Sequence, residues 1–203
     1  VGVARIMAAA DDRWRSMHED GTTLLIGARI RTEADVAVGL MLMGNVSLRL
    51  AAATEITIES ASRIHLHQGT VYVDTGLGYP TDQITEIITA NGVARDIGTQ
   101  FEVRYSNSAV RLRVREGIVL FRQQAEEYRG VAGEQLIIED VGVTARHAVA
   151  SDADDWYWVQ AIAPAPHSDE QTVAGLVRWV ARETGRDIHF ARDDIGIRAE
   201  TTL

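Results

Sequence analysis

The chain has 203 residues, enough for one large domain or two small ones. Charged residues make up 24% and hydrophobic residues 46%, ordinary values for a globular protein that exclude disorder and coiled coil. The net charge of −9 argues against nucleic acid or an anionic membrane surface as the main partner, and the absence of Cys excludes disulfides and thiolate chemistry.

Residues 1–20 precede the first strand-like pattern. From Ala4 to about Met17, alanines and unbranched Met predict a short helix. The sequence opens on Val1 without a signal-like stretch, and no apolar run approaches the roughly 20 residues that span a bilayer. We therefore expect a piece of a longer protein whose membrane anchor, if it has one, lies outside this sequence.

Residues 21–140 predict one all-β domain. Apolar residues alternate with polar ones in many short runs, as Ile56 and Ile58 do with Thr57 and Glu59. Glycines mark the turns between these runs. Such a pattern favours a sandwich, a barrel or a β-solenoid over an alternating α/β sheet, and without an exact repeat both solenoid and sandwich stay open.

The pattern changes after residue 140. Residues 141–158 are expected to be a linker, acidic at Ser151–Asp155. Residues 159–203 predict a small α/β domain in which Ser168 and Gln171 form a capping box and Gly185 stops the helix. The helix should bury one apolar stripe, and a strand should follow it at Asp187–Ala191. The stripe consists of Val173, Leu176, Val177 and Val180.

Four stretches of the β region, in order, resemble the motifs of the FecR family of anti-sigma factors. They are residues 63–73 (RIHLHQGTVYV), 93–103 (VARDIGTQFEV), 112–119 (LRVREGIV) and 131–135 (VAGEQ). The most specific is an apolar residue, Gly-Thr, then Phe-x-Val. Further on, residues 158–163 and 176–186 resemble the secretin-and-TonB N-terminal (STN) domain that follows the FecR domain in such proteins.

The resemblance implies the periplasmic part of a cell-surface signalling regulator anchored in the bacterial inner membrane. Residues 1–20 would then be membrane-proximal. The implied partners are the signalling domain of an outer-membrane TonB-dependent transducer and an extracytoplasmic-function sigma factor. The sigma factor would be held by a cytoplasmic segment joined through a transmembrane helix, and neither is present in this sequence. Control of iron uptake is the implied role, with no cofactor.

The motif residues have a structural explanation. The glycines should adopt positive φ values at turns, where a Cβ would clash. Thr99 should satisfy backbone groups while Phe101 points into the core, and Trp158 should help to fasten the linker. The glycines concerned are Gly69, Gly98, Gly117 and Gly133.

His65 and His67 are weak candidates for a metal site. At positions i and i+2 of a strand they share one face, the spacing of cupin-type metal enzymes. Such a site needs a nearby carboxylate, and none follows before Asp74. A cupin-like metal- or ligand-binding protein is therefore the alternative function, and an adhesion module of the cell envelope is a third.

Other candidate chemistry is weaker still. Asp152, Asp154 and Asp155 lack the Gly and Glu of a calcium loop, and no Ser has a nucleophile-elbow context. The alternating Arg111, Arg113 and Arg115 indicate either a face paired with nearby Glu or a patch for anions. We therefore predict no catalytic residues and no enzyme.

The best candidates for partner contact lie on the C-terminal helix. Trp179 falls at the shoulder of the apolar stripe, with Arg178 beside it and Arg182 one turn later. Aromatic residues and Arg are enriched at interface hot spots. We expect these three to contact the transducer.

Overall fold

The computed structural model describes residues 4–9, 11–17, 24–43, 45–75, 84–166 and 172–188. The chain forms two compact units, Val1–Val149 and Ala150–Leu203. No helix within the described ranges is long and apolar enough to cross a membrane.

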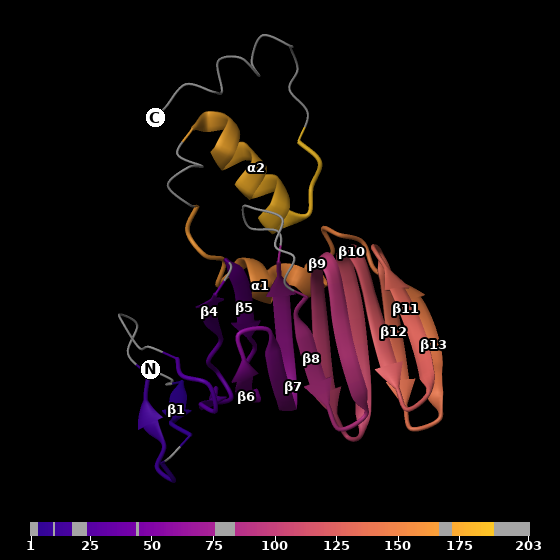
Figure 1. Ribbon diagram of the computed structural model, residues 1–203. Coiled ribbons are helices and arrows are strands. Elements are labelled where there is room, and N and C mark those ends of the chain that lie inside the picture. The colour runs from indigo at the N-terminus through magenta and orange to yellow at the C-terminus, as the bar shows by residue number, and fades with distance from the viewer. Residues whose placement is uncertain are drawn as a thin grey trace. The chain divides into compact units, whose positions relative to one another are not determined.

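In the described residues the first unit is one sheet of thirteen strands (Figure 1). The mainly β class predicted from the period-two pattern is confirmed. The strands are β1 (Arg5–Met7), β2 (Arg15–Ser16), β3 (Arg29–Arg31), β4 (Val38–Leu42), β5 (Val46–Leu50), β6 (Glu55–Ser60), β7 (Arg63–Asp74), β8 (Glu86–Thr89), β9 (Gly92–Ser106), β10 (Ala109–Gln123), β11 (Glu126–Val131), β12 (Glu134–Glu139) and β13 (Gly142–Ala148).

Three long strands fold this sheet into two layers. The first half of β7 pairs with β6 and its second half with β5. Likewise β9 pairs first with β8 and then with β7, and β10 first with β12 and then with β11. Layer A is β4, β5, the second halves of β7 and β9, the first half of β10, β12 and β13. The remaining strands and strand halves form layer B.

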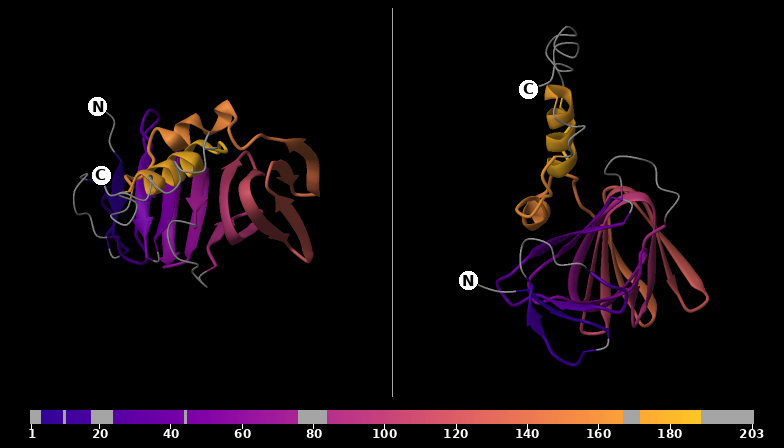
Figure 2. Two further views of the ribbon diagram at one scale, coloured as in Figure 1. Left: turned by 90° about the horizontal axis from the view of Figure 1, so that it is seen from above. Right: turned by 60° about the vertical axis from the view of Figure 1, so that its left-hand side comes forward.

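The two layers face each other across one core. A Cβ on Gly130 of β11 in layer B would lie 3.1 Å from Val114 and 3.2 Å from Leu136, which belong to layer A. Phe101 is fully buried in the same core, as predicted, and so is Val103. The layers can be followed in the two views of Figure 2. The fold thus combines a sandwich core with solenoid-like crossings at the ends of the layers.

At one end of the layers the crossings form a threonine corner, made of Thr32, Thr54, Gly69 and Thr70. The Thr54 hydroxyl accepts from Thr70 N–H (2.9 Å) and donates to Thr70 O (3.2 Å). The Thr32 hydroxyl accepts from Thr54 N–H (2.9 Å). These Thr side chains satisfy buried backbone groups that have left the strand ladder.

At the other end a glycine corner contains Gly98, Thr99, Gly117 and Gly133. The positive φ values predicted for its glycines are observed, at 65°, 80° and 82°. A Cβ on Gly117 would lie 2.6 Å from Gly98 O, so β9 and β10 approach each other too closely for a side chain. Beyond the opposite ends of these strands, Asn107 and Ser108 make the hairpin turn, with φ values of 51° and 58°.

The helix predicted from Ala4 to Met17 is wrong. Those residues contain β1 and β2, and β1 extends layer B by pairing with β3. Ile6 and Met17 pack against the core, so burial at a sheet edge outweighs the helix propensity of the alanines. The linker predicted at 141–158 also differs from the structure, because β13 occupies its first part and the boundary between the units follows Val149.

The described part of the second unit is helical, with η1 (Asp154–Trp156), α1 (Tyr157–Gln160) and α2 (Val173–Thr184). Thr172 caps α2 by accepting from Gly175 N–H (3.0 Å), and Gly185 ends it with a φ of 68°, as predicted. The predicted capping box lies outside the described residues, as does the predicted strand beyond Ile188. Asp187 and Ile188 themselves are not in a strand.

The predicted apolar stripe of α2 is not its buried face. Leu176 is exposed, and Val173, Val177 and Val180 are only half-buried. The fully buried positions of α2 are Gly175 and Glu183. Periodicity identified an apolar face, but burial depends on which face meets other residues.

We expect Gly69→Ala to destabilise the protein by about 2–5 kcal/mol, from backbone strain plus overpacking. At a φ of +95° its Cβ would lie 2.4 Å from Thr54 Oγ1 and 2.8 Å from Ala53 O. Gly98→Ala is the matched control, because φ is +65° and nothing lies within 4 Å. It should cost only about 1–2 kcal/mol. Urea unfolding measures the free energy of unfolding of both variants. Equal losses of stability in Gly69→Ala and Gly98→Ala would contradict the role of the threonine corner.

Candidate functional site

A row of polar side chains crosses the outer face of layer A. In the strand register Arg49 lies opposite Tyr72, Tyr72 opposite Glu102, Glu102 opposite Arg113, and Arg113 opposite Gln135. The row therefore spans β5, β7, β9, β10 and β12. It alternates with core residues such as Leu48 and Val73, which explains why it points outward. We call these five residues the polar row.

Most neighbours in the polar row are in direct contact. The Arg49 guanidinium lies 5.2 Å from the centre of the Tyr72 ring, a cation–π distance. Arg111, next to the row, donates to Glu102 Oε1 at 2.8 Å, and Arg113 Nη1 lies 3.8 Å from the same oxygen. The interpretation of the arginine strand as a face paired with Glu is thus supported for Arg111 and Arg113.

Three of the five residues of the polar row are buried although they are polar. Arg49 and Tyr72 are fully buried and Glu102 is 1% exposed. Burial is the main reason that the pKa of Tyr72 is raised, and the neighbouring Asp74 adds to it. Asp74 itself accepts from Gln100 Nε2 at 2.8 Å. The row therefore holds a neutral phenol between Arg49 and Glu102, an arrangement suited to fixing side chains in one geometry.

Another buried acid, Asp96, lies at the glycine corner. Asp96 Oδ2 accepts from the Thr75 hydroxyl at 2.9 Å, and its other oxygen accepts from Thr85 N–H. Thr99 N–H donates to Thr75 Oγ1 at 2.9 Å, so the family-like Gly-Thr pair is linked to this acid. Burial raises the pKa of Asp96, while these hydrogen bonds oppose the shift. Asp96 thus ties together three segments of the chain.

His65 and His67 share one face of β7, as their spacing predicts. Their rings stack with centroids 4.4 Å apart, His67 Nε2 lies 2.8 Å from the Thr57 hydroxyl, and His65 Nδ1 lies 3.4 Å from Glu59 Oε1. Burial, His65 and Arg29 lower the pKa of His67. Among the described residues no group of three His, Cys, Asp or Glu side chains could hold a metal ion.

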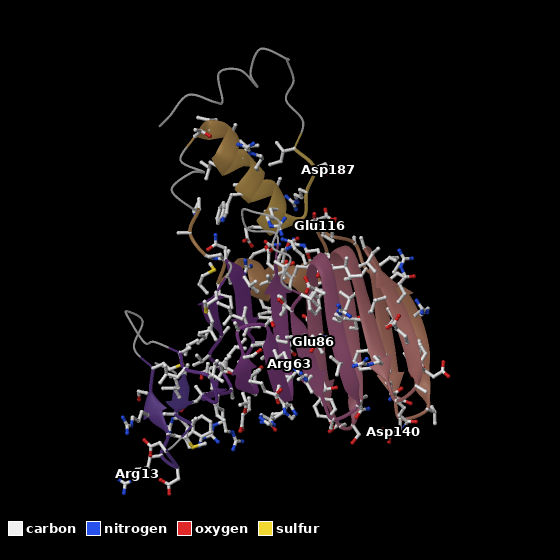
Figure 3. All side chains as sticks on the ribbon, viewed as in Figure 1. Arg13, Arg63, Glu86, Glu116, Asp140 and Asp187 are labelled. Atoms are coloured by element: carbon white, nitrogen blue, oxygen red, sulfur yellow. The ribbon has the colours of Figure 1, made fainter. Side chains whose placement is uncertain are left out.

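The surroundings of the histidines are ion-paired. Figure 3 shows Arg63 and Glu86 near each other on neighbouring strands, and Arg63 Nε lies 3.4 Å from Glu86 Oε2. Arg29 pairs with Glu55. With the His67 ring engaged by Thr57, the third ligand required by a cupin-type site is missing from the described residues, and nothing in the structure favours that alternative.

The predicted partner-contact residues all lie on α2. Arg178 is exposed, while Trp179 and Arg182 are half-buried. Trp179 Nε1 donates to Pro164 O at 3.1 Å, so its ring also holds the segment that follows α1. Trp158, in α1, is half-buried. Their role in partner binding stays a prediction.

Sequence reasoning missed most of the polar row and Asp96. Alternation with core residues would have placed Arg49, Tyr72 and Glu102 together on one sheet face. The sequence carries no signal that this face is buried, because polar residues at outward positions are ordinarily solvated.

Residues 28–120 match the family model described as FecR protein. The chain carries a FecR domain. The matched residues run from the start of β3 to the second half of β10 and include the threonine corner, the polar-row residues of β5, β7, β9 and β10, and the histidine pair. Three of the four motifs that resemble FecR lie within this range, and they contain Gly69, Gly98 and Gly117, which stand at the crossings between the layers. A comparison with curated proteins finds no match.

Two solved structures share the fold, both of a proposed anti-sigma factor from Parabacteroides distasonis ATCC 8503. They are 14% and 13% identical to this chain, each with a TM-score of 0.55. The alignments cover 78% of this chain and 76% and 75% of those chains. At this identity the likeness is one of fold.

We expect Asp96→Asn to change how stability depends on pH. Because the folded pKa of Asp96 is raised above 3.8, its contribution to stability is fully present below that pH and is lost as pH rises through the folded pKa. The melting temperature of the wild type relative to Asp96→Asn should therefore fall from about pH 4 to about pH 7. A relative melting temperature that rises over this range would contradict the assignment.

His67→Gln should show the opposite slope. The folded pKa of His67 is lowered from 6.5, so the unfolded chain takes up the proton first and stability falls as pH drops below that value. The wild type should lose melting temperature relative to His67→Gln between about pH 7 and about pH 5. His147→Gln, at an exposed position of β13, is the control. If the melting temperatures of the wild type and His67→Gln changed with pH in parallel, the lowered pKa of His67 would be refuted.

Proposed function

We propose that this chain is the periplasmic signalling region of a transmembrane anti-sigma regulator. The observation that carries the proposal is the FecR domain at residues 28–120, and the fold shared with a proposed anti-sigma factor supports it. In this role the chain is a binding and relay module rather than an enzyme. A cytoplasmic segment outside this sequence would hold an extracytoplasmic-function sigma factor.

The second unit is the proposed receiver. It would bind the signalling domain of an outer-membrane TonB-dependent transducer, in a system for iron uptake. Arg178 is exposed on α2 and carries a charge suited to an acidic partner surface. Trp179 and Arg182 complete the proposed contact face. The STN-like character of residues 159–203 belongs to this proposal as well.

The junction between the units offers a route for the signal. The Ser151 hydroxyl donates to Gly185 O at 2.8 Å, and Arg186 Nε lies 3.9 Å from Asp152 Oδ2. The end of α2 is therefore bound to the residues that leave the β unit. Directly before them, Val149 N–H donates to Gly133 O at 2.9 Å. In this proposal a change at α2 is passed to the β unit along the backbone that connects Ser151 to Val149.

The proposal predicts that Arg178→Ala weakens binding of the purified transducer signalling domain by about tenfold or more, as a hot-spot residue does. Isothermal titration calorimetry measures this. Trp179→Phe removes the hydrogen bond to Pro164 O but keeps an aromatic ring at this position, so it tests whether the indole N–H is needed for binding. Arg13→Ala, an exposed arginine of the β unit, is the matched control.

Two results would count against this role. Unchanged affinity in both Arg178→Ala and Trp179→Phe would count against a contact through these two residues of α2. An equal loss in Arg13→Ala would point to unspecific attraction between charges instead of a contact on α2.

A further inference from the structure

The strand β4 has an open side. It pairs with β5 along one side and with no other strand of the described residues. Its opposite side therefore presents backbone N–H and C=O groups, as every sheet edge does. In Figure 1, β4 and β13 lie at opposite ends of layer A.

The other edges of the described sheet carry features that discourage strand addition. β2 has two residues, one of them the exposed Arg15. β11 begins with the exposed Glu126 and Glu127. In β13, Arg146 Nη1 donates to Arg129 O of β11 at 3.2 Å, which binds the two edges to each other. Charge and short length are the usual protections of edges.

β4 lacks these protections. No residue from 36 to 48 is charged. On its outer face Met41 is 45% exposed, and Met43 just beyond is 73% exposed. On the inner face Val38 and Leu42 pack against the core but are only half-buried. A strand added to this edge would cover apolar surface on both faces.

The sequence of β4 is complementary to itself. In an antiparallel pair centred on Leu40, Val38 faces Leu42 of the second copy on the inner side. On the outer side Gly39 faces Met41, so a residue without a side chain leaves room for the larger one. No like charges lie opposite each other. Because a two-fold axis relates the two strands, each copy makes the same set of pairs.

We propose that β4 is a dimerisation edge through which a second copy of this chain pairs, continuing layer A across the two-fold axis. Five-residue strands bury little surface compared with a standard interface, so the dimer is reversible and depends on concentration. This inference goes beyond the proposed function and does not depend on the transducer.

Sedimentation velocity over a concentration series tests the pairing. The wild type should shift from monomer towards dimer, and Met41→Lys should remove the shift by placing a charge on the edge. Ile97→Lys changes an apolar residue of similar exposure, 53%, on the interior strand β9 and should dimerise like the wild type. A wild type that stays monomeric overturns the proposal and leaves a strand of a different protein as the occupant of this edge.

Disulfide trapping gives a second measurement on chains that fold normally. Because the protein has no Cys, a chain with Gly39→Cys mixed with a chain with Met41→Cys contains only the two introduced thiols. The mixture should form the 39–41 disulfide dimer faster than either variant alone. Equal rates for the mixture and for a mixture of Gly39→Cys with Ile97→Cys would overturn the proposed register.

Discussion

The structure depends on satisfying backbone groups where the chain leaves one layer and enters the other. A strand that crosses a corner loses its ladder partners, and a buried unpaired N–H or C=O group costs about 1–3 kcal/mol. At one end the hydroxyls of Thr32 and Thr54 replace the missing partners. At the other end Asp96 and Thr75 do so, with glycines providing positive φ. Because each corner serves several strands, the two layers form a single cooperative unit.

The polar side chains on the outer face of layer A also help to specify how its strands pair. Arg49, Tyr72, Glu102 and Arg113 lie opposite one another on neighbouring strands, with contacts between Arg49 and Tyr72 and between Glu102 and Arg113, and the first three are buried. Truncating one member would leave a buried charge without its partner, which is costly. The polar row thus fixes the register of β5, β7, β9 and β10 independently of the apolar core. The same strands bear the FecR motifs.

Much of the β domain could be predicted from the sequence, because alternation and positive-φ glycines are local signals. Gly98, Gly117 and Gly133 are examples, and Phe101 is in the core as its position in the strand predicts. The predicted N-terminal helix could not be excluded from the sequence, because the alanines favour a helix. The packing of Ile6 and Met17 against the core, which favours strands, depends on the rest of the fold. The burial of Tyr72 and the hydrogen bonds of Asp96 depend on residues distant in sequence. His65 and His67 share a face as predicted, but their partners come from β6 and could not be read from spacing.

The corners and the hairpins differ in how much change in length they tolerate. Residues inserted at Gly69 or Gly117 would separate backbone groups that bond across neighbouring crossings, so an insertion there would disturb several strands. The turn at Asn107 and Ser108 connects β9 to β10 at the end of the sheet, and Ser108 O also accepts a hydrogen bond from Asn91 Nδ2 of the neighbouring turn. Relatives of different length should therefore vary at such hairpins, and the same turn is the place to attach a fluorophore or an epitope without disturbing the corners.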